Sequence, residues 1–146
     1  MSFNGFLVVD KPAGYSSHQV VAKVRKILKE RRVGHTGTLD PMATGVLVVA
    51  VGAGTKLIPF LDEQKKVYQA KLVLGLTTDT QDLSGQVVST QPETLITQEL
   101  IRAALANFTG ELEQTPPMYS AVKVQGEPLY KLARAGKEIP RQKRKI

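Results

Sequence analysis

The residues best suited to chemistry lie together in residues 34–45, which read GHTGTLDPMATG. This segment holds three glycines, three threonines, one histidine and one carboxylate, that of Asp40. The apolar run 46–51 follows at once, so the pattern predicts a loop that leads into a buried strand and holds its one acid at a defined point. Pro41 disfavours helical backbone at Asp40 and stiffens the bend. Taken alone, the segment favours a structural interpretation, a turn in which Asp40 accepts hydrogen bonds from nearby backbone amides.

Composition excludes several other kinds of site. The 146 residues contain no cysteine, which rules out disulfides, thiolate catalysis and cysteine-ligated metals and fits a reducing, cytoplasmic compartment. His18 and His35 are the only histidines, so a histidine-rich metal site is excluded as well. Because no run of about 18 apolar residues occurs, we expect no membrane-spanning helix. The length is sufficient for one domain with its own core.

Positive charge is concentrated in two segments. Residues 23–32 carry six basic side chains and one acid, and residues 123–145 carry eight basic side chains and two acids. Since the net charge of the whole chain is +7, the remainder is mildly acidic. Two basic segments on such a body indicate a polyanionic partner, with nucleic acid as the first candidate. Charge alone is equally typical of two solvated faces.

Apolar periodicity and turn residues predict a series of short elements that must position these groups. Ser16 or Ser17 is expected to cap a helix that runs to about residue 28. Its inward stripe would comprise Val20, Val21, Val24, Ile27 and Leu28. Thr97 is expected to cap a helix that runs to residue 108. Its inward residues would be Leu100, Ile101, Ala104, Leu105 and Phe108.

The remaining elements are shorter. Short helices are expected at residues 55–61 and 129–135, and strands at residues 6–9, 46–51, 67–74, 86–90 and 120–124. The basic run 141–145 fits either a disordered tail or the start of a strand. Strands outnumber helices and are not regularly interleaved with them. We therefore predict an α+β fold with a mixed, mostly antiparallel sheet and flanking helices.

Five segments that occur in order resemble one known family. They are residues 10–17 (DKPAGYSS), 34–45, 66–68 (KVY), 78–80 (TDT) and 117–123 (PMYSAVK). Together they closely resemble the N-terminal half of the bacterial tRNA pseudouridine-55 synthases of the TruB type, over essentially all 146 residues. The resemblance implies the pseudouridine synthase fold and an isomerase that turns a uridine in the T-arm loop of tRNA into pseudouridine. It also implies that no cofactor or metal is needed, and that the full-length protein is a monomer.

The resemblance gives Asp40 a role. In this family the base is detached from C1′ of its ribose, rotated and rejoined through C5, and by the match Asp40 is the nucleophile. An ionised carboxylate can add to the ribose or base, or support departure of the uracil, and the residues leave these routes open. Because no water has to be activated, one carboxylate is sufficient, unlike the pair that many glycosidases use.

Two further matched residues would bind the uridine, which has to leave its stack to reach the carboxylate. His35 matches the residue that inserts into the tRNA loop; without the match, a loop histidine bonded to backbone is favoured. Tyr68 matches the aromatic residue that stacks on the flipped base; without the match, a strand tyrosine on the core face is favoured. Stacking of this kind is worth roughly 1–3 kcal/mol per base.

The other matched positions are more peripheral. Lys11 lies in a Lys-Pro motif that packs near the catalytic loop in the family, and it is a candidate for contact with RNA. Asp79 would orient active-site groups or, equally, stabilise its own turn. Residues 118–141 match a mobile clamp over the tRNA, in keeping with their basic charge. The candidate RNA contacts in this clamp are Tyr119, Lys123 and Arg134.

The chain departs from the family in its length. The resemblance implies that the catalytic domain continues past residue 146 with further strands, an arginine that pairs with Asp40 and usually a small C-terminal RNA-binding domain. The 146-residue piece alone is therefore expected to be weak or inactive. The alternative is a non-catalytic RNA-binding or tRNA-folding module, which the basic segments also fit. An aspartyl-nucleophile hydrolase ranks last, since Asp40 has no metal-binding companion.

Overall fold

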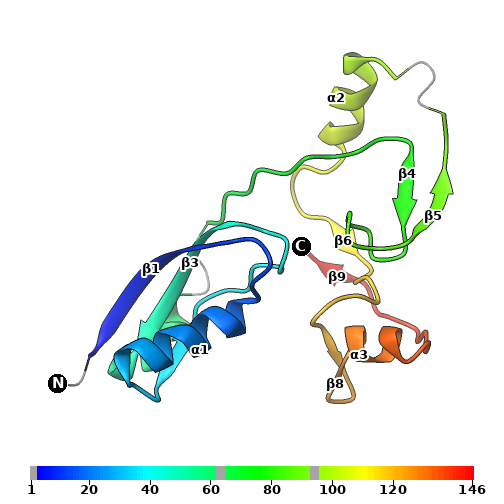
Figure 1. The fold of residues 1–146 in the computed structure, drawn as a ribbon. Coiled ribbons are helices and arrows are strands. Elements are labelled where there is room, and N and C mark those ends of the chain that lie inside the picture. Colours follow the sequence, from blue (N-terminus) through cyan, green and yellow to red (C-terminus); the bar gives the residue numbers. More distant parts are fainter. Residues whose placement is uncertain (1–2, 62–64, 93–95) are drawn as a thin grey trace. The chain divides into compact units, whose positions relative to one another are not determined.

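A three-stranded antiparallel sheet lies at the centre of the first half of the chain (Figure 1). The computed structural model describes residues 3–61, 65–92 and 96–146, which fall in two units, Met1–Gln69 and Ala70–Ile146. In the first unit, β1 (Gly5–Lys11) and β2 (Val33–His35) pair on either side of β3 (Gly45–Val51). Each of these strands leads into or out of the loops that matter for the site.

The helix α1 (Ser17–Leu28) starts where the sequence predicts. The Ser16 hydroxyl accepts a hydrogen bond from the Gln19 backbone N–H, and the Gln19 side chain accepts one from the Ser16 N–H, which makes a capping box. The helix ends at Lys29, whose φ of 51° is in the left-handed region. These local signals explain why a sequence rich in β-branched valine forms a helix here.

The core of the first unit lies between α1 and one face of the sheet. Its buried members are Val20, Val21, Val24, Val33, Leu47, Val49 and Val51, with Leu28 partly buried against them. Ile27 was expected to join this core, and that expectation is wrong because its side chain is 75% exposed. Leu28, one residue further along, does reach the core, so periodicity gives the apolar face of a helix but not how much of the width of that face the sheet covers.

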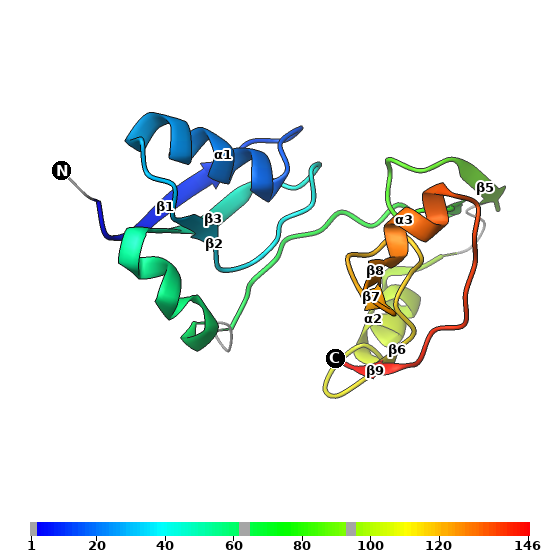
Figure 2. The same cartoon turned by 90° about the horizontal axis from the view of Figure 1, so that it is seen from below.

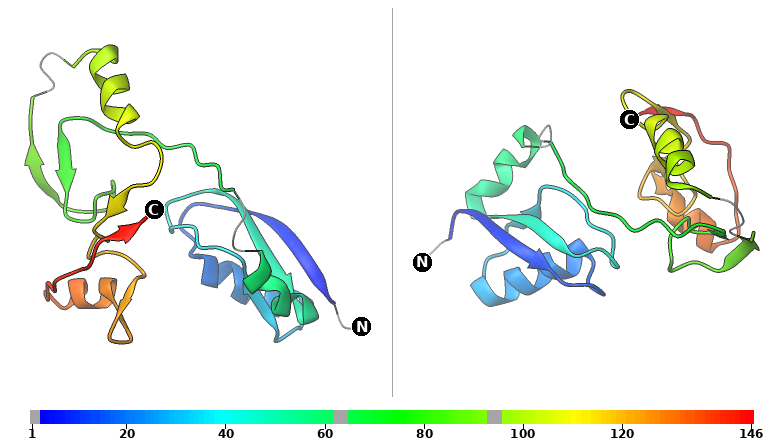
Figure 3. Two further views of the ribbon diagram at one scale, coloured as in Figure 1. Left: turned by 180° about the vertical axis from the view of Figure 1, so that it is seen from behind. Right: turned by 90° about the horizontal axis from the view of Figure 1, so that it is seen from above.

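A 3₁₀ helix, η1 (Gly52–Phe60), lies on the other side of the sheet (Figures 2 and 3). A Cβ atom at Gly34 of β2 would lie 3.0 Å from Ile58 Cδ1, so glycine allows η1 to approach the strand. The sequence predicts this helix at 55–61, and the structure starts it three residues earlier. The rest of that sheet face is open, with Val8 73% and Val46 70% exposed.

The described part of the second unit holds three antiparallel strand pairs and two helices. The pairs are β4 (Leu76–Thr78) with β5 (Val87–Thr90), β6 (Glu113–Gln114) with β9 (Arg144–Lys145), and β7 (Lys123–Val124) with β8 (Glu127–Pro128). The helices α2 (Gln98–Ala106) and α3 (Leu129–Arg134) lie at opposite ends of this unit (Figure 1). The basic run 141–145 thus includes a short strand, and the strand expected at 120–124 is reduced to two residues.

Two expectations for the segments 67–74 and 97–108 are wrong. The helix α2 begins at its Thr97 cap as predicted, but it buries none of its residues, and Leu100 is 59% exposed and Leu105 55%. Residues 67–74 form no strand, and Val67 is 87% exposed. Both segments have an amphipathic pattern. Such a pattern shows which face is apolar, but not whether another element packs against that face. A strand also needs a hydrogen-bonded neighbour, and no described strand pairs with residues 67–74.

The predicted α+β class is confirmed, since all the strand pairs in the described parts of the chain are antiparallel and the helices stand beside them. Instead of the expected single sheet, residues 3–61, 65–92 and 96–146 contain four small ones. Within the described residues, no helix combines the length and the apolar character needed to cross a membrane.

Candidate functional site

The loop between β2 and β3 carries Asp40 and is anchored on both sides of it. At its start, the Thr36 N–H donates to the carbonyl of Val48 on β3 at 3.0 Å. Immediately after Asp40, the Pro41 carbonyl accepts from the Gly14 N–H at 2.8 Å. The loop is therefore attached to the sheet at one end and to the turn after β1 at the other.

Asp40 itself presents its side chain to solvent. Its backbone carbonyl accepts from the Ala43 N–H at 3.0 Å, which closes a tight turn. The carboxylate forms no hydrogen bond or ion pair with any residue in 3–61, 65–92 or 96–146. The structural interpretation, in which this carboxylate caps nearby amides, is therefore wrong. Asp40 is instead an accessible carboxylate on an anchored turn, which is what a nucleophile requires.

Lys11 is a buried residue that holds the loops around Asp40. Its side chain is 0% exposed, and its ammonium donates to the carbonyls of Pro12 at 3.1 Å, Tyr15 at 2.6 Å and Pro41 at 3.3 Å. These three bonds use all three donors of an ammonium group. A direct contact with RNA, expected from the sequence, is not open to this buried group. In the structure Lys11 joins the end of β1 to the loop that carries Asp40.

His35, the last residue of β2, lies against the start of α1. Its ring and that of His18 are arranged edge to face with centroids 5.7 Å apart. The His35 Nδ1 atom is buried and has no hydrogen-bond partner among the described residues. The sequence alone favours a hydrogen bond between the His35 ring and the backbone, and the Nδ1 atom forms none with the described residues.

Tyr15 is a site-adjacent residue that sequence reasoning missed. The Lys23 ammonium donates to the Tyr15 hydroxyl at 3.0 Å and lies 4.5 Å from the centroid of its ring. The hydrogen bond, and then the positive charge, of Lys23 lower the pKa of the Tyr15 hydroxyl. Tyr15 also contributes a carbonyl to Lys11. The spacing of eight residues between Tyr15 and Lys23 offers no recognisable signal in the sequence.

Tyr68 is not brought to the Asp40 loop by any contact in the described structure. It lies in a stretch without regular secondary structure, and its side chain is 68% exposed. The alternative of a strand tyrosine on the core face is therefore wrong. Tyr68 presents a free aromatic surface.

Asp79 and Asp82 shape the β4–β5 connection. Asp79 Oδ1 accepts from the Gln86 N–H at 2.8 Å, so the turn-stabilising role is present. The Asp82 carboxylate accepts from the hydroxyls of Thr80 and Ser84 and from the Ser84 N–H. These bonds, that of the Ser84 hydroxyl foremost, lower the pKa of Asp82 against an opposing effect of burial.

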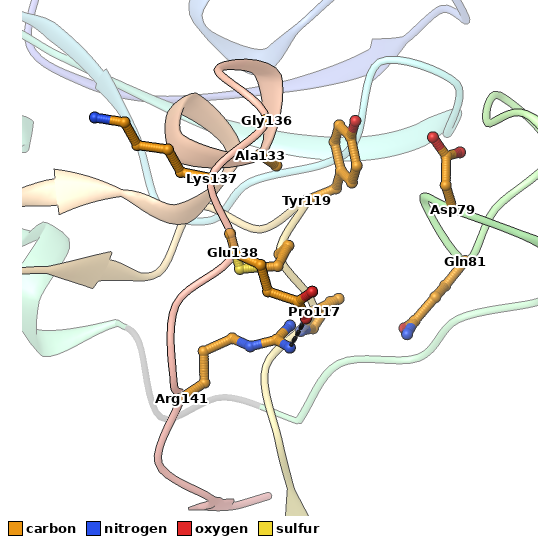
Figure 4. Close-up of a pocket in the computed structure, with 10 residues that line it drawn as sticks. Asp79, Gln81, Pro117, Tyr119, Ala133, Gly136, Lys137, Glu138 and Arg141 are labelled. Carbon is orange, nitrogen blue, oxygen red and sulfur yellow. Dashed lines mark hydrogen bonds and ion pairs between the residues drawn. The ribbon is translucent and has the colours of Figure 1, made fainter.

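A shallow pocket of about 350 Å³ in the second unit brings two predicted residues together (Figure 4). Asp79 and Tyr119 both line it, with Arg141 on another wall. The Arg141 guanidinium donates to the Pro116 carbonyl at 3.2 Å and to the Glu138 carboxylate at 3.0 Å. The pocket therefore combines an aromatic ring with charges of both signs.

Lys123 and Arg134, the remaining predicted contacts, are exposed in the second unit. Lys123 is in β7, and Arg134, the last residue of α3, stacks its guanidinium 5.5 Å from the ring centroid of Tyr130. Neither shares a described contact with the Asp79–Tyr119 pocket. Nowhere in the described ranges do three or more histidine or acidic side chains gather as metal ligands would.

Comparison with known sequences gives a consistent result. The model of the TruB family pseudouridylate synthases (N terminal domain) matches residues 25–146. The tRNA pseudouridine synthase B of Geobacter sulfurreducens is 57% identical over 143 residues, 98% of this chain and 47% of that protein. The enzyme of the same name from Oenococcus oeni is 54% identical, over 99% of this chain and 49% of its own length. The chain spans about half the length of the curated relatives it matches.

Solved structures agree with the sequences. A crystal structure of a Cbf5-Nop10-Gar1 complex contains a chain 30% identical, with a TM-score of 0.54 over 82% of this chain and 31% of that one. The archaeal box H/ACA sRNP Nop10-Cbf5 complex contains one 26% identical, with a TM-score of 0.50 over 84% and 35% of the two chains.

Proposed function

We propose, because the chain belongs to the TruB family of pseudouridylate synthases, that the protein containing it isomerises a uridine of tRNA to pseudouridine with Asp40 as the nucleophile. The observation that carries this proposal is the Asp40 carboxylate, which is exposed and lies on a turn anchored on both sides. The names of the relatives support tRNA as the substrate.

The reaction proposed for this site needs no redox partner. The bond from C1′ to N1 breaks, the bond from C1′ to C5 forms, the hydrogen on C5 leaves as a proton, and N1 gains a proton. Asp40 adds to the ribose or base, or supports departure of the uracil. Anchoring its two neighbours limits the positions that the carboxylate samples, and such limits are a large part of catalytic rate.

The proposal extends to the residues that bind the RNA. His35 would insert into the tRNA loop, while Tyr68, whose ring is free, would stack on the extruded uridine. Tyr119 and Asp79, which share a pocket, would contact the RNA from the second unit. Residues 118–141 would close over the tRNA, and the exposed cations of Lys123 and Arg134 would neutralise phosphates.

We further propose that the RNA recognised is the T-arm stem-loop, and that the full-length protein acts on it as a monomer in the cytoplasm. Both follow from the likeness to tRNA-modifying relatives, and the first is directly testable. A T-arm stem-loop carrying tritium on C5 of its uridines should lose one tritium per RNA when incubated with the full-length protein.

The same assay separates the enzyme from the alternative. Tight, salt-sensitive binding of the stem-loop without tritium release would establish a non-catalytic RNA-binding module instead. Release of uracil with loss of the glycosidic bond would indicate a hydrolase. A stem-loop in which only the target uridine is replaced by cytidine is the matched control, and it should release no tritium above background.

A further inference from the structure

Ser17 is tied to the residue before Asp40 by hydrogen bonds in both directions. Its hydroxyl donates to the Leu39 carbonyl at 3.1 Å and accepts from the Leu39 N–H at 3.0 Å. We infer that Ser17 is a positioning residue for the Asp40 nucleophile. This inference rests on the proposed function and names a residue that supports it from outside the loop.

The helix does not need the Ser17 hydroxyl. The capping box of α1 is made by Ser16 and Gln19, and Ser16 is the residue whose side chain caps the helix. Ser17, one position later, is only 3% exposed. A buried hydroxyl is costly unless it is paired, and Leu39 supplies both a donor and an acceptor. The two adjacent serines therefore differ in role: Ser16 caps α1, and Ser17 binds the loop at Leu39.

The pairing immobilises Leu39 in three ways. Both of its backbone polar groups are bound to Ser17, and its side chain packs against the core of the first unit. On the other side of Asp40, the Pro41 carbonyl is bound by Gly14 and Lys11. Asp40, whose backbone carbonyl accepts from the Ala43 N–H, thus lies between two fixed residues while its carboxylate stays unbonded among the described residues. Releasing Leu39 would leave the carboxylate anchored on one side only.

The expected consequence is a loss of rate rather than of binding. A displacement of about 1 Å of a catalytic group costs on the order of 100-fold in rate. Ser17 is only 3% exposed and offers no polar group at the surface, so RNA affinity should not depend on it. A role limited to stability would instead lower the melting temperature and leave the rate per folded molecule unchanged.

The test uses the full-length protein and compares Ser17→Ala with Ser16→Ala under single-turnover conditions on the tritiated stem-loop. We expect Ser17→Ala to lower the rate constant by about 10- to 100-fold with RNA affinity within threefold of wild type. Ser16→Ala should lower thermal stability but keep the rate constant within twofold. Amide hydrogen exchange at Leu39 should accelerate in Ser17→Ala and not in Ser16→Ala.

A second variant covers the case in which Ser17→Ala does not fold. Ser17→Cys keeps nearly the same volume but replaces the hydroxyl by a weak donor and acceptor, so its rate constant should also fall. If either folded Ser17 variant, with accelerated Leu39 exchange, isomerises uridine at the wild-type rate, the positioning role is wrong while the proposed function stands. If wild-type protein releases no tritium, the proposed function fails, and the positioning role fails with it.

Discussion

The ammonium of Lys11 lies 3.3 Å from the carbonyl oxygen of Pro41, thirty residues away in the chain. The same group binds two further carbonyls beside it, so one buried cation joins the end of β1 to the turn that carries Asp40. Such a contact explains how an exposed acid can be held in place by a residue that is itself buried.

Replacing Lys11 by methionine should therefore be costly. The variant keeps the length of the aliphatic stem but removes the ammonium from three carbonyls, of which only that of Pro41 keeps another donor, the Gly14 N–H. We expect a loss of about 2–3 kcal/mol in the free energy of unfolding. Lys26→Met is the control, since Lys26 of α1 is exposed and its side chain forms no hydrogen bond or ion pair with a described residue, so stability should change by no more than about 0.5 kcal/mol. Urea titrations measure both, and equal stability of the two variants would show that the buried bonds do not matter.

The core under the site gives a second prediction. Val49 in β3 is 0% exposed, whereas Val46 on the same strand is 70% exposed. Val49→Ala should lower the free energy of unfolding by about 2 kcal/mol through lost burial and the cavity that remains. Val46→Ala should change it by less than about 0.5 kcal/mol. A similar loss in both variants, measured by thermal unfolding, would mean that the assigned core face is incorrect.

Asp82 provides a pH-dependent prediction. Hydrogen bonds to its carboxylate hold its pKa below the ordinary value of about 3.9 in the folded protein. A carboxyl with a depressed folded pKa contributes stability that is present above the unfolded pKa and is lost as the pH falls through the folded pKa.

The measurement is the difference in stability between wild type and Asp82→Asn as a function of pH. Wild type should be the more stable above about pH 4, and the difference should close below it. A carbon-13 titration of the Asp82 carboxyl should show a midpoint below that of a model peptide. A midpoint at or above the peptide value would exclude the assigned hydrogen bonds.

Lys123 tests the proposed RNA clamp. It is exposed in β7, so Lys123→Ala should weaken binding of the T-arm stem-loop and reduce the slope of log affinity against log salt by about 1. Lys56→Ala, an exposed cation of η1 outside every proposed contact, should leave the slope unchanged. An unchanged slope for Lys123→Ala would remove this residue from the interface.

What the sequence predicts well is local. The capping box of Ser16 and Gln19 and the apolar run of β3 each depend only on residues that are close in sequence. The helix α1 and the strand β3 both form where expected. What fails depends on distant partners. Residues 67–74 alternate and α2 has an apolar face, as the sequence indicates. Neither segment, however, contains information about which other element would pack against its apolar side.

The site divides in the same way. Asp40, His35 and Tyr68 become candidates through the resemblance of whole motifs to a family. The supports of Asp40 are not, because Ser17 meets Leu39 across 22 residues and Lys11 meets Pro41 across 30. The sequence suggests a helix cap for Ser17 and an RNA contact for Lys11. In the structure both side chains instead bind the backbone of the loop that carries Asp40.

The role of Asp40 is tested most directly by a matched pair of substitutions in the full-length protein. Asp40→Asn removes the nucleophile with little change of shape, and Asp10→Asn changes an exposed acid of β1 in the same way. We expect Asp40→Asn to lower single-turnover tritium release from the T-arm stem-loop by more than about 10³-fold, with RNA affinity unchanged. Asp10→Asn should keep the wild-type rate. Wild-type turnover by folded Asp40→Asn would contradict the central claim.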